Sequence, residues 1–195
     1  MNFDFFAYIS RMKYISRWAL MRSTVQENVQ EHSHMTAVLA HALGLIRRDV
    51  LGLDCNPDAL AAAALYHDAP EILTGDMPTP IKYHSPYIKN AYDEVEQIAV
   101  EKLLAELPEA LRDSYRALLT PNCSEEFAAL LKAADKLSAY LKCIEERRAG
   151  NREFGSAEAA SLKKLQEMHL PEVDYFLAHF APSFEKDLDE LGTLE

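Results

Sequence analysis

The sequence lacks the features that mark several large classes of protein. Its three cysteines, Cys55, Cys123 and Cys143, are far apart and show no Cys-x-x-Cys spacing, so no disulfide framework is indicated. We expect them to be reduced and buried in a cytoplasmic protein, with a metal-ligand role as the alternative. No apolar run approaches the roughly 18 residues of a membrane span. Charged residues interrupt the N-terminal stretch, so we expect neither a signal peptide nor a membrane partner.

Positive charge is also scarce. The formal net charge is −11, with 20 basic and 31 acidic side chains. A nucleic-acid polymer or an anionic membrane requires a broad basic face, which we therefore do not expect. Any phosphate-bearing ligand would need a local basic pocket. The length of 195 residues suits one substantial core, and we expect a single domain over residues 1–195.

Alternating β-branched stretches are nearly absent, whereas apolar residues recur at three- and four-residue spacings. This pattern predicts an all-α fold of about eight helices. The expected helices, some bounded by capping residues, prolines and glycines, cover residues 3–20, a segment within 25–49, then 56–68, 85–107, 109–119, 124–150, 156–168 and 172–191.

The stretch from Leu65 to Pro80, LYHDAPEILTGDMPTP, concentrates residues that can carry chemistry. On a helix, His67 and Asp68 lie about 100° apart, so an imidazole and a carboxylate can meet at one metal ion. Glu71 follows His67 by four residues, on nearly the same face. Asp76 follows a glycine typical of a helix end, which would place it on a loop over that end. The alternative for the His-Asp pair is an ion pair at the end of a helix.

Two further candidates stand on other expected helices. His32 shares a face with apolar and small residues and should point toward the core, which favours it over His34 and His41. Asp135 lies in mid-helix between apolar neighbours, where a carboxylate must be paired or bound to a metal. A pairing of Asp135 with Lys132 or Tyr140 is the structural alternative.

Two cationic positions could serve a phosphate. Arg17 and Trp18 stand together, so a guanidinium fork could bind a phosphate beside a flat wall for a sugar or base. A surface arginine beside a core tryptophan is the alternative. Lys82 follows the Pro-x-Pro segment, and an exposed lysine with no ligand is the alternative there.

Taken together, His32, the pair His67-Asp68 and the late Asp135 give the order H…HD…D. This order and spacing resemble the HD-domain phosphohydrolases. The resemblance implies an HD-type helical bundle in which these four residues bind one divalent metal ion.

The resemblance extends beyond the four residues. The segments ISRWALMR, ENVQEHS, YHDAPEILTGDMPTPIKY and ADKLSAYLKCIEE look like those of the bacterial YfbR-type 5′-deoxynucleotidases, and the similarity runs from residue 3 to about residue 190. It implies a homodimer acting on deoxyribonucleoside 5′-monophosphates. Arg17 would orient the phosphate, and Trp18 would lie against the deoxyribose and disfavour a 2′-hydroxyl. The residues implied at the substrate are Arg17, Trp18, His32, Asp68, Asp76, Met77, Pro78, Thr79 and Asp135.

Hydrolysis of a phosphomonoester needs a positioned water, neutralised phosphoryl oxygens and a proton for the leaving alkoxide. The metal and Arg17 would neutralise the oxygens. Asp76 is the leading candidate to position the water and protonate O5′, with Glu71 sharing the proton handling. Two imidazoles and two carboxylates suit Mn²⁺, Co²⁺ or Zn²⁺, and the resemblance favours Co²⁺ or Mn²⁺.

Other HD activities are the alternatives. Hydrolases of deoxynucleoside triphosphates or guanosine tetraphosphate would be expected to have a larger basic surface, and cyclic-dinucleotide phosphodiesterases a GYP-type motif, which this sequence lacks. A di-iron oxygenase needs further histidines, yet only His84 lies between Asp68 and Asp135. A non-catalytic nucleotide sensor would not need both Glu71 and Asp76.

Overall fold

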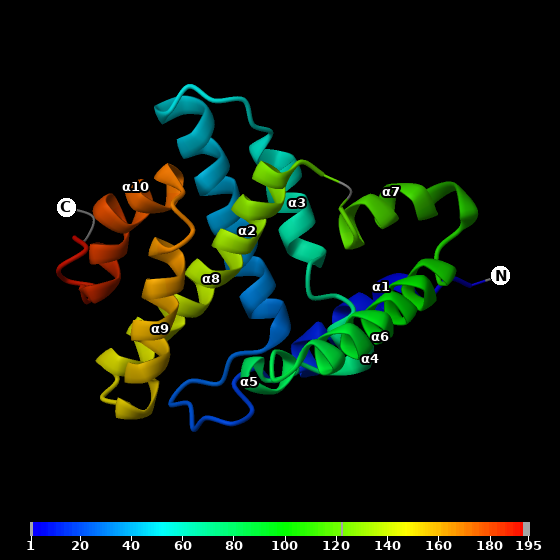
Figure 1. Ribbon diagram of the computed structural model, residues 1–195, viewed down its shortest axis with the longest axis horizontal. Helices are drawn as coiled ribbons and strands as arrows, with labels where there is room; N and C mark the ends of the chain where they lie inside the picture. Colours follow the sequence, from blue (N-terminus) through cyan, green and yellow to red (C-terminus); the bar gives the residue numbers. More distant parts are fainter. Residues whose placement is uncertain (1, 122, 193–195) are drawn as a thin grey trace.

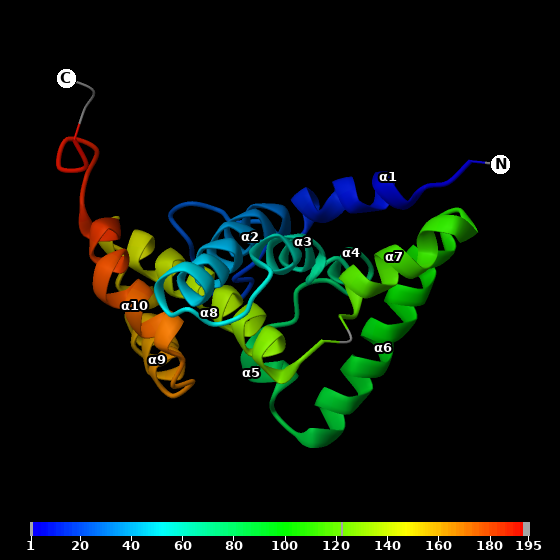
Figure 2. The ribbon, with the colours of Figure 1, turned by 90° about the horizontal axis from the view of Figure 1, so that it is seen from above.

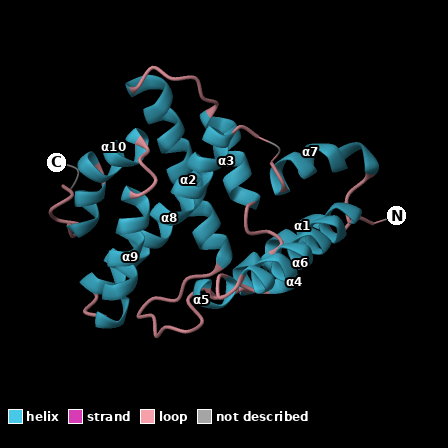
Figure 3. Cartoon of the chain, in the orientation of Figure 1, coloured by secondary structure: helices cyan, strands magenta, loops and turns pink. Residues whose placement is uncertain are grey.

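The computed structural model describes residues 2–121 and 123–192. These residues form helices joined by turns and loops, without a strand (Figure 3), as the all-α prediction required. In chain order (Figure 1) the α-helices are α1 (Phe5–Ile9), α2 (Val29–Leu45), α3 (Pro57–Tyr66), α4 (Glu71–Thr74), α5 (Thr79–Lys82), α6 (Pro86–Ala105), α7 (Glu109–Leu119), α8 (Glu125–Arg148), α9 (Gly155–Gln166) and α10 (Pro171–His179). The shorter helical segments are η1 (Ser10–Tyr14), η2 (Ile46–Val50), η3 (Arg152–Phe154) and η4 (Ala181–Glu185).

The helices α2, α3, α6 and α8 begin at capping residues that the sequence supplies. Asn28 starts α2 with a capping box, in which its side chain accepts from the backbone N–H of Glu31 and the Glu31 carboxylate accepts from the backbone N–H of Asn28. Asn56, Ser85 and Ser124 cap α3, α6 and α8 through their side-chain oxygens. These caps fix the first turns of the helices.

The prediction of one helix over residues 3–20 is wrong beyond residue 14. The helical path ends with η1, and Ser16 then forms an antiparallel bridge with Asn28. The backbone N–H of Arg17 donates to the carbonyl of Glu27 at 3.0 Å, so this segment makes its hydrogen bonds across the bridge rather than along a helix. Apolar spacing reports which side chains are buried, and it cannot show that the backbone has left the helix.

Other helices also end before their predicted ends. Helix α3 stops at Tyr66, so His67 and Asp68 lie on the turn after the helix. Pro70 explains the stop, because it has no N–H to continue a helix and disfavours helical geometry in the residue before it. The last helix ends at His179 instead of 191, and Pro182 lies in the short segment η4 that follows.

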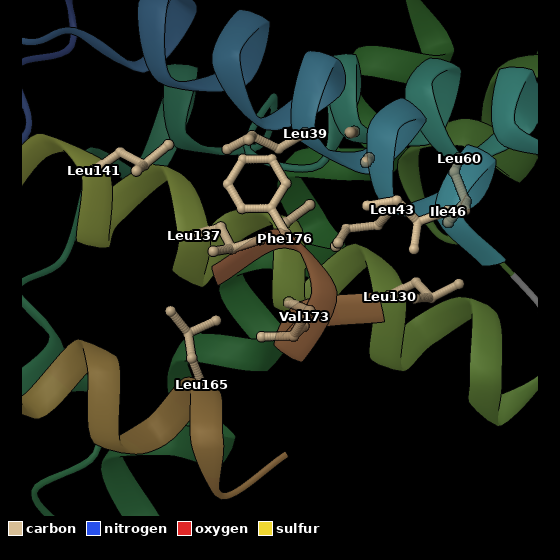
Figure 4. Packing of buried hydrophobic residues seen from close by; sticks show 14 of the residues in the cluster. Leu39, Leu43, Ile46, Leu60, Leu130, Leu137, Leu141, Leu165, Val173 and Phe176 are labelled. Carbon is tan, nitrogen blue, oxygen red and sulfur yellow. The ribbon is translucent and has the colours of Figure 1, made fainter. Parts of the chain in front are cut away.

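The main core lies where α2 packs against α3 and α8, with α9 covering α8 and α10 packing against α2 and α9. Figure 4 shows Phe176 of α10 among leucines that include Leu39 of α2 and Leu137 of α8. The buried alanines of α3 allow close packing against α2. This packing brings the three segments that bear His32, His67 and Asp135 to one place.

A second buried cluster joins α1 to α6 and includes Phe5, Val100 and Leu103. Figure 2 shows α6 and α7 forming a V beside the α2, α3 and α8 layer. The turn between α3 and α4 belongs to this cluster through Ala69. The cluster therefore supports the segment that carries His67 and Asp68 from the side opposite the main core.

The cysteine prediction is partly wrong. All three are free thiols and Cys143 is buried, but Cys55 is half-buried and Cys123 is exposed. Cys123 lies in the connection between α7 and α8, where a surface loop leaves it in contact with solvent. Across the described parts of the chain, the helices are too short or too polar to span a bilayer.

Candidate metal and phosphate site

His32 lies at the centre of a polar cluster inside the helical bundle. Its side chain is fully buried, and Nδ1 lies 3.1 Å from the Ser138 hydroxyl of α8. Its Nε2 lies 3.1 Å from Oδ1 of Asp135 and 3.5 Å from Oδ2 of Asp68. The structure thus brings together residues more than 100 positions apart, and Asp135 faces His32 instead of the predicted alternatives Lys132 and Tyr140.

His67 is oriented with one nitrogen available for a ligand. Its Nδ1 donates to the carbonyl of Ala64 at 2.7 Å, which places the proton of the neutral ring on Nδ1. Its buried Nε2 makes no hydrogen bond and lies 3.1 Å from Oδ2 of Asp68. This arrangement, with one ring nitrogen fixed by a carbonyl and the other free, is typical of metal-binding histidines.

The donor set fits a divalent metal ion. One ligand atom from each of His32, His67 and Asp135 can be chosen so that all three lie within 4.8 Å of one another, and Asp68 lies beside both imidazoles. Burial lowers the pKa of His67, but the charges of Asp68 and Asp135 outweigh it and raise the pKa to about 9. The site therefore attracts positive charge, supplied by a proton or by a metal ion.

Asp68 is the most connected carboxylate of the cluster. Its Oδ2 lies near both imidazoles and 3.4 Å from Nη1 of Arg17. Burial raises the pKa of Asp68, but the effects of His67, His32 and Arg17 lower it by more, so the pKa lies well below its ordinary value. Asp68 is therefore ionised and available as a ligand at neutral pH. The pKa of Asp135 is likewise lowered, because hydrogen bonding and charge from His32 outweigh its burial.

Arg17 joins this cluster to the bridge that leads into α2. Its Nε donates to Glu27 at 3.1 Å and its Nη1 to Asp68 at 3.4 Å. Burial lowers the pKa of Arg17, but Asp68, Glu27 and nearby acids raise it above its ordinary value. A guanidinium has five N–H donors, so three remain for an anion in the adjoining cavities.

Two adjoining cavities of about 520 Å³ and 620 Å³ open beside the cluster, and Arg17, Asp76 and Asp135 line both. Asp68, Glu71 and Met77 line the first, and Trp18 and Pro78 the second, while Thr79 lines both. Every residue predicted at the substrate except the buried His32 therefore faces this space. A hollow of about 710 Å³, lined by parts of residues 25–35, α8 and the C-terminal segment, contains none of the predicted site residues.

Glu71 and Asp76 flank the first cavity. Glu71 lies at the start of α4 and not on the helix of His67, so the shared-face prediction is wrong. The Glu71 side chain is buried, and burial together with the charges of Asp68 and Asp76 raises its pKa to about 10. Asp76 follows Gly75, whose φ of 74° ends α4 as predicted. Burial and the charge of Asp68 raise the pKa of Asp76 despite the nearby Arg17.

Several residues in the site were missed by the sequence reasoning. Lys132, Lys136 and Lys164 line the first cavity, and they bring local positive charge to a space that carboxylates also line. Lys132 and Lys136 lie three residues before and one residue after Asp135, and this spacing could have indicated that they lie near the site. Lys164 lies on α9, and no sequence pattern connected it to the site. The Lys82 ammonium lies 2.9 Å from Glu96, so its charge is already paired. Glu27, which holds Arg17, was also overlooked.

Known proteins are similar to this chain in sequence. The chain matches the family of YfbR-like 5′-deoxynucleotidases over residues 4–184. A 5′-deoxynucleotidase of Pectobacterium atrosepticum is 51% identical over 189 residues, which are 96% of this chain and 95% of that protein. A 5′-deoxynucleotidase of Yersinia pestis is 50% identical over 189 residues, 96% of each chain.

Solved structures show the same fold. An HD-domain phosphohydrolase from Listeria innocua superposes with a TM-score of 0.82 at 26% identity, covering 97% of this chain and 92% of that one. The HD phosphohydrolase of cyanophage S-2L was solved bound to dA and one catalytic Zn²⁺ ion. It superposes with a TM-score of 0.66 at 21% identity, covering 93% of this chain and 96% of that one. Since the family match spans most of the chain and relatives reach half identity over nearly its full length, this chain belongs to the YfbR-like 5′-deoxynucleotidase family.

Proposed function

We propose that the protein is a metal-dependent 5′-deoxynucleotidase, which hydrolyses deoxyribonucleoside 5′-monophosphates to a deoxynucleoside and phosphate. One observation carries the proposal above all. His32, His67, Asp68 and Asp135 converge from distant parts of the chain on one cluster, beside the partly satisfied guanidinium of Arg17. The relatives that are half identical to this chain are 5′-deoxynucleotidases, which supports the same activity here.

The four cluster residues would hold the metal ion, and Arg17 would bind the phosphate. When bound, the ion supplies Lewis-acid stabilisation of the charge on the phosphoryl oxygens. Arg17 presents its remaining N–H donors to the same oxygens from a position fixed by Glu27 and Asp68. The lysines of the first cavity add positive charge around the phosphate.

Asp76 and Glu71 would handle water and protons. Asp76 lines both cavities, which supports a role for it between the phosphate and the sugar. We therefore assign it the positioning of water and the protonation of O5′. Glu71 lines only the first cavity, and its buried carboxyl holds a proton at neutral pH, so it can share this role as a reservoir of protons.

Trp18 would distinguish deoxyribose from ribose. Its indole is half-buried against Phe154, with ring centroids 5.2 Å apart, and it lines the second cavity. Placed against C2′ of the sugar, this rigid surface would leave a 2′-hydroxyl without a hydrogen-bond partner, which disfavours ribonucleotides.

The finer assignments belong to the same proposal. We expect Co²⁺ or Mn²⁺ as the metal, with Zn²⁺ also suited to two imidazoles and two carboxylates. We further propose a cytoplasmic homodimer of single-domain HD-type chains, acting on free nucleotides and not on a nucleic-acid polymer.

The decisive experiment measures phosphate release from dAMP and AMP by metal-stripped protein after Co²⁺, Mn²⁺, Mg²⁺ or Zn²⁺ is restored singly. We expect release from dAMP and little from AMP. Equal release from both would remove the sugar selectivity but leave the hydrolase. No release with any ion, from protein shown to bind it, would contradict the proposal.

Substitution Asp76→Ala separates an enzyme from a nucleotide sensor. We expect the variant to lose turnover and still bind dAMP, measured by phosphate release and by equilibrium binding. Asp174→Ala, which removes an exposed aspartate on α10 away from the cavities, is the matched control. Unchanged turnover in the Asp76 variant would exclude the assigned proton role.

A deoxynucleoside triphosphate is the second candidate substrate. Lys132, Lys136 and Lys164 around the first cavity favour it, since a longer phosphate chain needs more positive charge than Arg17 alone provides. Including dATP in the same assay tests it. Release of pyrophosphate or triphosphate faster than release of phosphate from dAMP would establish that alternative.

A further inference from the structure

Glu27 holds the two predicted substrate-binding residues through a single carboxylate oxygen. Its Oε2 accepts from Nε of Arg17 at 3.1 Å and from Nε1 of Trp18 at 2.8 Å. The side chains of Glu27 and Arg17 are each only 12% exposed, so water competes little for these bonds. One acidic group therefore sets the direction of both the guanidinium and the indole.

The backbone gives Glu27 a fixed position from which to act. Its carbonyl accepts from the backbone N–H of Arg17 at 3.0 Å, and the neighbouring Ser16 and Asn28 form the bridge. Asn28 is also the capping residue of α2, the helix that carries His32 in its first turns. Glu27 is thus tied to the same rigid helix as the metal cluster.

Trp18 needs such a restraint because its own backbone is strained. Its φ is 60°, in the left-handed region that a bulky side chain rarely adopts and that costs on the order of 1 kcal/mol. Strain of this kind persists only where the surroundings determine the conformation. The hydrogen bond to Glu27 and the contact with Phe154 hold the indole on its two sides.

Glu27 also limits the attraction between Arg17 and Asp68. Without Glu27, Arg17 would lose one of its two ion pairs and keep the one with Asp68, and a closer Arg17–Asp68 pair would draw both groups away from a bound phosphate and metal. With Glu27 in place, the Arg17–Asp68 contact stays at 3.4 Å.

We propose that Glu27 is a positioning residue that couples phosphate recognition to sugar selectivity by fixing Arg17 and Trp18 with one carboxylate. This inference rests on the proposed deoxynucleotidase activity. It predicts that loss of Glu27 lowers activity and selectivity together, although Glu27 itself lines neither substrate cavity.

The test compares Glu27→Ala and Glu27→Gln with wild type in the metal-loaded protein. Glutamine keeps an oxygen that can accept both hydrogen bonds, whereas alanine removes it. We expect Glu27→Ala to lower kcat/KM for dAMP by about 10- to 100-fold and to reduce the dAMP/AMP preference by about tenfold. Glu27→Gln should recover most of the preference. Glu94→Gln, at an exposed position of α6, is the matched control.

Fluorescence provides a readout that does not depend on activity. Trp18 is the only tryptophan in the chain, so its emission reports this indole alone. We expect a red shift and stronger acrylamide quenching in Glu27→Ala, but not in Glu27→Gln or Glu94→Gln. Circular dichroism checks that each variant is folded.

The outcomes separate the two proposals. If wild type releases no phosphate, the proposed function fails, while the fluorescence still tests the positioning of Trp18. If wild type is active and selective but Glu27→Ala keeps the same dAMP/AMP ratio and emission, the role of Glu27 is overturned. An equal loss of activity on both nucleotides with unchanged emission would also overturn it, since that pattern indicates a structural role only.

Discussion

At the residue scale, Arg17 acts through geometry as much as through charge. Its fork contacts Glu27 on one side and Asp68 on the other, and these contacts determine where the remaining donors point. A lysine at this position would carry the same charge as a single ammonium point and could not reproduce the planar arrangement. We therefore expect the proposed phosphate-binding role to require arginine at this position.

We predict that Arg17→Ala lowers kcat/KM for dAMP by about 10²- to 10³-fold, the range observed when one donor to a developing oxyanion is removed. Arg17→Lys should recover little of the loss. Steady-state phosphate release measures both variants, and metal analysis should show an unchanged metal content. The control is Arg48→Ala, which breaks only an exposed pair with Asp49. Activity within twofold of wild type in both Arg17 variants would refute the assignment.

At the element scale, the loop that carries Trp18 is anchored by one buried carboxylate on α8. Glu146 is fully buried and accepts from the backbone N–H and the hydroxyl of Thr24, from the backbone N–H of Val25 and from the Asn151 amide. Lys142 lies 2.9 Å away and also donates to the carbonyl of Val25. These bonds tie the loop before α2 to the helix that bears Asp135.

We predict a pH-dependent loss of stability from Glu146. Burial raises its pKa, but the hydrogen bonds from Thr24, Asn151 and Lys142 outweigh burial and lower the pKa well below its ordinary value. The stabilisation is therefore complete above the ordinary glutamate pKa, about 4.3, and is lost as the pH falls through the lower folded-state pKa. Urea unfolding below pH 5 should show a steeper decline in wild type than in Glu146→Gln.

At neutral pH, Glu146→Gln should lower the free energy of unfolding by about 3–5 kcal/mol, because it removes the buried carboxylate that pairs with the buried Lys142 and leaves the exposed Glu145 as the counter-charge of that lysine. Glu145→Gln is the matched control, since Glu145 contacts the same lysine from an exposed position and should contribute about 0–1 kcal/mol. Equal losses in the two variants would show that Glu146 is not the anchor.

The contact between α2 and α3 gives another prediction at this scale. A Cβ added at Gly44 would lie 2.9 Å from the backbone Cα of Pro57, at the start of α3. Gly44→Ala should therefore destabilise the fold by about 1–3 kcal/mol, although alanine is the better helix former. Gly155→Ala, where nothing lies within 4 Å of the added Cβ, should be neutral or stabilising by up to about 1 kcal/mol. Thermal unfolding of the two variants measures these stability changes. A Gly44→Ala variant more stable than wild type would contradict the close contact.

At the scale of the whole molecule, the cluster joins α2, the turn after α3, and α8. A metal that binds only the native arrangement should stabilise the entire fold, by about 2.7 kcal/mol at a free ion concentration of 100 times Kd. We predict this effect for Mn²⁺ or Co²⁺ in urea unfolding, and its loss in His67→Ala. His34→Ala removes an exposed histidine of α2 and should keep the full response. An undiminished response in His67→Ala would exclude that residue as a ligand.

Much of the fold was open to prediction from the sequence. Asn56, Ser85 and Ser124 act where their side chains satisfy free N–H groups of a first helical turn, which is a local property. The start of the chain was mispredicted because the bridge between Ser16 and Asn28 joins segments separated by a loop. Its hydrogen bonds depend on the position of α2, which no local pattern contains.

The sequence by itself determined the helical class and the caps, since each depends on residue type and short-range spacing, and its resemblance to a family supplied the order of the proposed ligands. Only the tertiary structure decided that Asp135 faces His32 across two helices, that three lysines surround the cavity, and that Glu27 holds Arg17 and Trp18 with one oxygen. The physical reason is that helix formation satisfies backbone groups within a few residues. The direction of a buried polar side chain is set instead by partners that packing brings from distant parts of the chain.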